Sequence, residues 1–128
     1  MRVLLDTHAV IWWVDHDELL SASAHEAIAD SRNELLISAA SVWEIAIKVG
    51  IGKLKLSLPY RAWMNQAITD LRASMLPISV DACDVQSSLP LHHGDPFDRV
   101  IVAQSFVEQI TVVSNDSTFD LYGVRRLW

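Results

Sequence analysis

The sequence has almost no cysteine: its 128 residues include a single one, Cys83, so no internal disulfide bond can form. That composition is typical of proteins in a reducing compartment. Long apolar runs are also missing, and no segment approaches the ~20 apolar residues that span a membrane. Asp6 interrupts the only apolar stretch near the start, which argues against a signal peptide. We therefore expect neither a disulfide framework nor a membrane-spanning segment.

The sequence also lacks an excess of positive charge. Its formal net charge is −6, which argues weakly against nucleic-acid binding because polyanions repel acidic proteins. A divalent cation bound to clustered acids would cancel part of that charge. Residues 45–69 contain Lys48, Lys53, Lys55 and Arg61 but no Asp or Glu. This basic stretch either contacts a phosphate backbone or is a solvated face with lysines near a helix C-terminus.

The length and the order of segments indicate one α/β domain over residues 1–128. A chain of this size buries roughly 65–70% of its extended surface, enough for a core. Strands are expected at 2–6, 34–38, 75–78, 109–114 and 123–127. Helices are expected at 7–14 with Thr7 as the cap, and at 21–31, 41–49, 59–73, 81–88 and 96–108. This alternation predicts a parallel sheet covered on both faces.

Four carboxylates lie at the ends of predicted strands or in the first turns of predicted helices. Asp6 ends the first strand, Glu44 falls in the first turn of the helix after the second strand, and Asp116 follows the strand that ends at Ser114. The carboxyl ends of parallel strands share one edge, where ligands bind in open sheets. Asp98 joins them only if its helix starts on the same side.

If these four acids lie in one crevice, they need a bound cation to offset their charge. Like charges a few ångströms apart repel, so four carboxylates cannot all stay ionised and unpaired. Hard oxygen ligands favour Mg²⁺ or Mn²⁺. Such a cation activates water and offsets the charge that develops on a phosphoryl oxygen, so the pattern points to phosphodiester hydrolysis.

Each acid also has a purely structural explanation. Asp6 can favour a helix N-terminus, and Ser41 with Glu44 fits a capping box. Asp98 lies three residues after the expected helix cap Asp95, where the helix dipole stabilises a carboxylate, and Asp116 suits an ordinary turn. The sequence alone leaves these alternatives open.

Four segments together resemble the PIN-domain nucleases, and among them the VapC-type toxins of type II toxin–antitoxin pairs. They are VLLDTH at 3–8, SVWEIAIK at 41–48, DPFDRVIVAQ at 95–104 and VSNDSTF at 113–119. The segments come in family order and the resemblance runs nearly end to end. One departure is Ser114, where the family often has Thr, and a hydroxyl is retained.

The resemblance implies a three-layer α/β/α sandwich with a central parallel sheet, and an Mg²⁺- or Mn²⁺-dependent endoribonuclease. It carries the catalytic and metal-binding roles onto Asp6, Glu44, Asp98 and Asp116, with Asp6 and Asp98 as the principal ligands. Asp95 is a rival ligand that we interpret as the helix cap. The resemblance further implies in-line attack of water on RNA, a homodimer, a cognate antitoxin whose Arg or Lys enters the acidic groove, and a cytoplasmic location.

Several other residues have competing interpretations. His92 and His93 are interpreted as loop histidines, because no Cys or His follows at zinc spacing. Trp12 and Trp13 are expected to pack in the core or at a dimer interface rather than to stack on bases. Arg99 could contact a phosphate or form a structural ion pair.

Other protein classes fit the sequence less well. A phosphoacceptor receiver domain needs a lysine near the end of its fifth strand, and the last lysine here is Lys55. A small-molecule phosphatase usually has a second acid two residues after its nucleophilic Asp, whereas Asp6 is followed by Thr7 and His8. A non-catalytic PIN-like binding or assembly module remains as an alternative.

Overall fold

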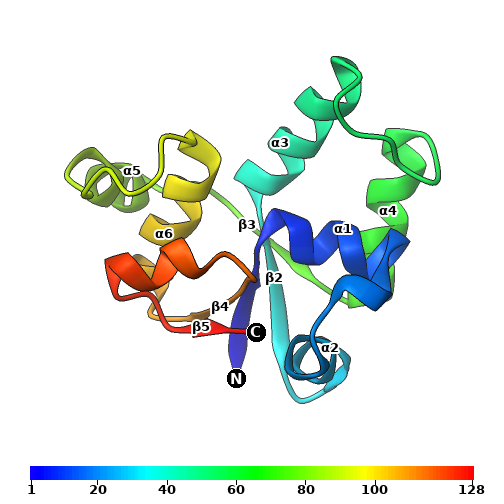
Figure 1. Ribbon diagram of the computed structural model, residues 1–128, viewed down its shortest axis with the longest axis horizontal. Helices are drawn as coiled ribbons and strands as arrows, with labels where there is room; N and C mark the ends of the chain where they lie inside the picture. The colour runs from blue at the N-terminus through cyan, green and yellow to red at the C-terminus, as the bar shows by residue number, and fades with distance from the viewer.

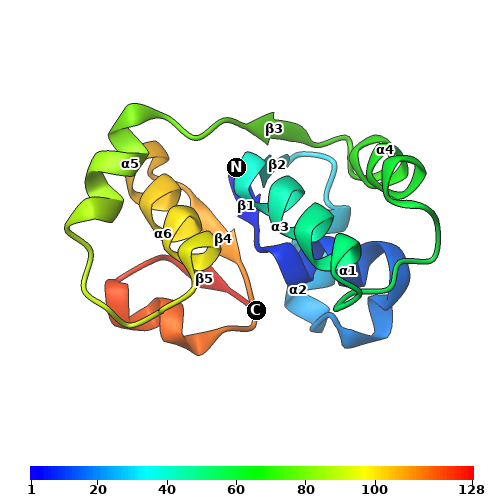
Figure 2. The ribbon, with the colours of Figure 1, turned by 90° about the horizontal axis from the view of Figure 1, so that it is seen from above.

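The computed structural model describes residues 1–128 and contains one five-stranded sheet with helices on both faces (Figures 1 and 2). The strands are β1 (Arg2–Leu5), β2 (Glu34–Ser38), β3 (Ser74–Leu76), β4 (Thr111–Val113) and β5 (Arg126–Leu127). Their order is β3-β2-β1-β4-β5, and every neighbouring pair is parallel. The predicted parallel α/β sheet is therefore confirmed.

Six α-helices and two short 3-10 helices connect the strands. The α-helices are α1 (Thr7–Asp15), α2 (Ala22–Ala29), α3 (Ala39–Gly50), α4 (Tyr60–Leu71), α5 (Val80–Ser87) and α6 (Pro96–Glu108). The 3-10 helices η1 (Asp17–Leu19) and η2 (Ser117–Tyr122) were not predicted. None of these helices is long and apolar enough to cross a membrane.

The central strands supply two separate cores, one on each face of the sheet. Successive strand residues point to opposite faces, so Val3 and Leu5 pack with α1 to α4, whereas Leu4 packs with α6 and η2. Figure 2 shows α5 and α6 on one side of the sheet and α1, α2 and α4 on the other. These two helical layers around the sheet form the expected α/β/α sandwich.

Register places three strand ends together. Leu5 of β1 pairs with Ile37 of β2 and with Val113 of β4. The next residues along the chain are Asp6, Ser38 and Ser114. Polar side chains from three separate segments therefore meet at the carboxyl edge of the sheet, where α1 and α3 begin.

Two predicted helix starts were wrong. Thr7 does not cap α1, because Asp6 is the cap and its carboxylate accepts a hydrogen bond from the Thr7 amide. Helix α3 begins at Ala39, and Ser38 caps it through the Ala40 amide. The capping box of Ser41 and Glu44, which was the structural alternative to a functional role for Glu44, does not form. Glu44 lies in the second turn of α3 rather than the first. Glu44 faces inward from α3, where it is 3% exposed.

Candidate active site

Asp6 is buried at the centre of the carboxyl edge, and both of its carboxylate oxygens accept hydrogen bonds. The Thr7 amide donates to Oδ1 over 2.7 Å, and the Ser114 hydroxyl donates to Oδ2 over 2.7 Å. Burial raises the pKa of Asp6 above its ordinary value despite these two bonds, and the nearby Glu44 charge adds to the increase. Asp6 is therefore fixed in place and is costly to ionise without a neighbouring cation.

Glu44 reaches the same region from α3. Its Oε1 accepts a hydrogen bond from the Thr7 hydroxyl over 2.8 Å, and its Oε2 accepts one from Lys48 Nζ over 2.6 Å. Lys48 is one turn further along α3, and its hydrogen bond to Glu44 raises the lysine pKa. Glu44 thus has a lysine as its counter-ion, which distinguishes it from Asp6 and Asp98.

Asp98 lies in the first turn of α6, and its carboxylate accepts no hydrogen bond from any residue of the chain. Burial, followed by the charges of Asp6 and Asp95, raises the pKa of Asp98 to about 7. Burial and the neighbouring carboxylates therefore both favour the protonated form of Asp98 when no cation is bound. A cation between the acids would favour its ionised form.

Asp116 follows β4 and is paired with a histidine that the sequence did not reveal as a site residue. His93 Nε2 lies 2.7 Å from Asp116 Oδ2, and the His93 side chain is only 9% exposed. Burial opposes ionisation of Asp116, but hydrogen bonds from His93 and Thr118 outweigh it and lower the pKa. His93 does lie in a loop, as interpreted from the sequence, but its contact with Asp116 was not predicted.

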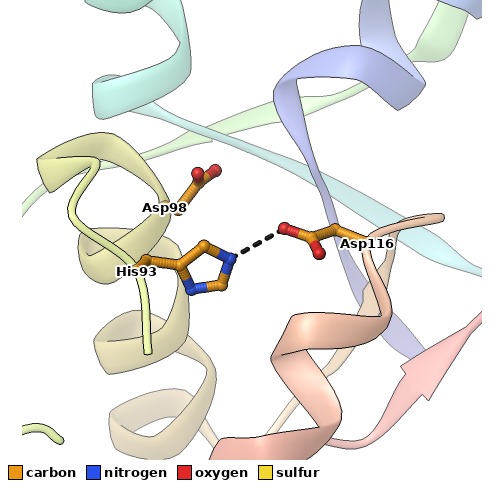
Figure 3. A group of neighbouring side chains, drawn as sticks. All are labelled: His93, Asp98 and Asp116. Carbon is orange, nitrogen blue, oxygen red and sulfur yellow. Dashed lines mark hydrogen bonds and ion pairs between the residues drawn. The ribbon is translucent and has the colours of Figure 1, made fainter. Parts of the chain in front are cut away.

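Figure 3 shows how His93, Asp98 and Asp116 converge. Each offers one metal-ligand atom, and the three atoms all lie within 4.8 Å of one another. His93 comes from the loop before α6, Asp98 from α6, and Asp116 from the segment after β4. The Asp98 carboxyl points into the space beside the His93–Asp116 pair.

Hydrogen bonds connect this cluster to Asp6. The Asp116 amide donates to Ser114 Oγ over 3.0 Å, and the same hydroxyl donates to Asp6. The buried Ser114 hydroxyl therefore uses its donor and an acceptor position, and it joins two of the predicted acids. The donor set consists of carboxylates and one imidazole, with Asp98 free of competing bonds. That chemistry fits a hard divalent cation.

A model of the PIN domain matches residues 3–124 of this chain. The chain belongs to the PIN-domain family. A ribonuclease named VapC22 from Mycobacterium tuberculosis is 34% identical over 116 residues, which cover 89% of this chain and 86% of the relative. The resemblance of the sequence to VapC-type PIN proteins is thereby confirmed.

Solved VapBC structures have the same fold as this PIN domain. A VapBC2 complex from Rickettsia felis, bound to a promoter DNA fragment, contains a chain with a TM-score of 0.74 and 16% identity, covering 98% of this chain and 97% of that one. A DNA-bound VapBC complex from Salmonella typhimurium gives a TM-score of 0.70 and 18% identity, covering 98% and 96%.

Three further residues of this PIN domain have structural roles. Asp95 caps α6 by accepting a hydrogen bond from the Phe97 amide, as predicted. Arg99 does not form the structural ion pair considered for it, and its guanidinium donates to the backbone carbonyls of Gln86, Leu89 and Pro90. These bonds hold the loop that carries His93 against α6. Trp128 lies against Trp12, with ring centroids 5.7 Å apart.

Proposed function

We propose that this chain is a divalent-metal-dependent endoribonuclease and the toxin of a toxin–antitoxin pair. The observation that carries the proposal is the Asp98 carboxylate, which has no hydrogen-bond partner and a pKa raised to about 7 beside Asp6 and Asp116. The relative named as a ribonuclease supports RNA as the substrate. The fold and the acids together support hydrolysis of phosphodiester bonds.

We assign metal binding and catalysis to the four acids predicted from the sequence. Asp98 and Asp6 are the principal ligands, and Asp116 completes the site from the other side. Glu44 borders the same space, and Lys48 and Thr7 hold its carboxylate. A bound Mg²⁺ or Mn²⁺ supplies compensation for the negative charge that develops on the phosphoryl oxygens.

His93 has a positioning role in this proposal. Its ring lies parallel to that of Tyr122 with an interplanar angle of 2°, and its Nδ1 is 3.1 Å from the Tyr122 hydroxyl. With the ring fixed, Nε2 holds the Asp116 carboxylate toward Asp98. Residues that orient a ligand in this way commonly change metal affinity or activity by 10–100-fold when they are replaced.

The experiment that tests the proposed activity compares RNA with DNA. The purified chain is incubated with a pool of structured RNA, or with DNA of matched length, in Mg²⁺, Mn²⁺ or EDTA. We expect discrete RNA fragments with either metal and none in EDTA, because the acids need a cation to bind a phosphate. Lack of both RNA cleavage and calorimetric Mg²⁺ binding would instead support a non-catalytic PIN-like module.

We also propose a cognate antitoxin as the partner. Solved structures of the same fold include VapBC complexes. Uncompensated carboxylates at the edge of the sheet would accept an Arg or Lys from an inserted segment. Co-purification with the product of the neighbouring gene should give a complex with less RNA cleavage. The proposed RNA substrate also supports a cytoplasmic location.

The outer face of α3 supports the proposal of a homodimer. Trp43, Ile47 and Ile51 are spaced four residues apart, so they form one stripe, and they are 61%, 37% and 61% exposed. The Trp43 ring also contacts Phe97 of α6, with centroids 5.5 Å apart. Exposed apolar stripes of this kind mark protein interfaces.

Sedimentation equilibrium tests the homodimer. We expect twice the 14.3 kDa mass of one chain for the unmodified protein. The double variant Trp43→Glu/Ile47→Glu should sediment as a monomer, because it places charges inside the buried interface. Val80→Glu changes a residue that is 85% exposed on α5 and serves as the control. If the double variant remains dimeric, the dimer interface does not lie on the outer face of α3.

A further inference from the structure

All three lysines of this acidic chain line a single groove. The groove has a volume of about 490 Å³ and lies between α1, α3 and the connection from α3 to α4. Its lining includes Lys48, Lys53 and Lys55, together with His8 and His16. No Asp or Glu is among the lining residues, although the chain has 16 acids and a net charge of −6. The basic stretch noticed in the sequence therefore forms one concave cationic surface, which we call the lysine groove.

Hydrogen bonds fix the shape of the lysine groove, because they hold both ends of the segment that carries Lys53 and Lys55. At its start, the amides of Lys53 and Leu54 both donate to the Lys48 carbonyl, over 2.9 and 3.2 Å. At its end, the Ser57 amide and hydroxyl donate to the Asp15 carboxylate of α1, over 3.0 and 2.6 Å. Figure 2 shows this connection passing close to α1 before it reaches α4.

Two of the three ammonium groups are free for a ligand. Lys48 forms an ion pair with Glu44, whereas Lys53 and Lys55 form no ion pair and donate no side-chain hydrogen bond. Both are exposed, and the buried Ile11 and half-buried Trp12 line the groove with them. The groove therefore offers unpaired positive charges beside an apolar and aromatic surface, a combination that suits phosphates linked to unpaired bases.

The lysine groove is continuous with the acidic site. Thr7 lines the groove, and it also donates to Glu44 and, through its amide, to Asp6. Lys48 lines the groove as well, and it is close enough to Asp98 and Asp95 for their charges to raise its pKa. A polyanion held along the groove would therefore extend directly to the clustered carboxylates.

We propose that the lysine groove binds the phosphate backbone of single-stranded RNA on one side of the bond to be cleaved. This inference rests on the proposed ribonuclease function and adds the surface that holds the substrate. Lys53 and Lys55 each neutralise a backbone phosphate, and Lys48 marks the passage to the acidic site. The positive groove also offsets the repulsion between RNA and the rest of this acidic chain.

The test measures binding of a fluorescent 12-nucleotide 2′-O-methyl oligouridylate in Mg²⁺ at several salt concentrations, and a gel checks that the probe stays intact. For single strands, each lost phosphate contact lowers the slope of log Kd against log salt by about 0.7. We expect Lys53→Gln/Lys55→Gln to lower the slope by about 1.4 and to weaken binding about tenfold at low salt. The control Arg72→Gln/Arg125→Gln removes the same charge shortly before β3 and β5, at the amino-terminal ends of these strands.

Each result of this experiment has a definite meaning. Equal slopes for the lysine and arginine variants, or no binding by the unmodified chain, would overturn the proposal. Weaker binding of hexaglutamate with unchanged oligouridylate binding would assign the groove to an acidic peptide instead. RNA cleavage is scored separately, so a correct groove without cleavage would refute only the ribonuclease proposal, and cleavage without a lysine effect would refute only the groove.

Discussion

Replacing Asp98 with Asn should reduce RNA cleavage by about a thousandfold. The substitution keeps the shape of the side chain but removes the charge that a divalent cation needs. Metal ions contribute several kcal/mol of transition-state stabilisation, which corresponds to a rate factor on the order of a thousand. Because the Asp98 carboxylate accepts no hydrogen bond within the chain, its replacement breaks no structural contact of that kind. The measurement is the single-turnover rate on a defined RNA at saturating Mg²⁺.

The chain offers a matched control for this variant. Asp84 is an exposed aspartate of α5, and Asp81 and Asp84 have the same spacing as Asp95 and Asp98. Asp84→Asn should cleave RNA at the unmodified rate. If Asp98→Asn retained more than a tenth of the activity while keeping its circular dichroism spectrum, Asp98 would not be a principal ligand, and the assignment of the site would need revision.

Without metal, the protein should become less stable as the pH rises from 5 to 8. Asp98 has a folded-state pKa of about 7 against an ordinary 3.8, so between these values the folded state holds a proton that the unfolded state has lost. The free energy of unfolding therefore falls as the pH rises through this window. The raised pKa of Asp6 acts in the same direction. Asp116, Asp15 and Asp120 have lowered pKa values, so their effect on stability lies below about pH 4.

The expected loss of unfolding free energy is smaller than the full pKa shift would give, because solvent screens the charge of Asp98. Asp98 is only partly buried, so screening leaves on the order of 1–2 kcal/mol of the full linkage. For a domain of this length the change in melting temperature is roughly 3–8 °C. Melting curves in EDTA at pH 5, 6, 7 and 8 provide the measurement. A melting temperature that rises steadily from pH 5 to 8 in EDTA would contradict the raised pKa of Asp98.

Mg²⁺ and Asp98→Asn should each reduce this pH dependence, and in Asp98→Asn the contribution of Asp6 remains. At pH 8, Mg²⁺ binds the ionised acids of the folded state and raises the melting temperature. Asp98→Asn, with no charge to bury, should melt above the unmodified metal-free protein at pH 8, although it has lost its activity. The variant would thus be inactive but more stable, as is common when an active-site residue is replaced.

The sequence was sufficient to predict the sheet because each strand is a short apolar segment between helix signals. The four acids could be named from their places after strands and at helix starts. Burial of Glu44 could not be foreseen, since Ser38 and Ser41 are both adequate caps and the sequence does not say which of them begins the helix. With Ser38 as the cap, Glu44 lies in the second turn of α3 and is buried.

His93 and the lysine groove show what one-dimensional patterns omit. His93 is recognisable only through its long-range partners, Asp116 at a separation of 23 residues and Tyr122 at 29. Its neighbour His92 packs edge-on against Tyr122 and takes no part in the cluster. The basic stretch was visible in the sequence, but its concave shape depends on the hydrogen bonds of Ser57 to Asp15, which no local pattern encodes.

The Ser114–Asp6 hydrogen bond has a consequence for the order in which the molecule is made. It joins residues 108 positions apart, and β1 pairs with β4 across a similar separation. A chain emerging from the ribosome carries Asp6 more than a hundred residues before Ser114 and Asp116 are added. The proposed centre therefore stays incomplete until β4 and the residues after it have been synthesised, and an interrupted product that ends before β4 would lack both Asp116 and the bond that anchors Asp6.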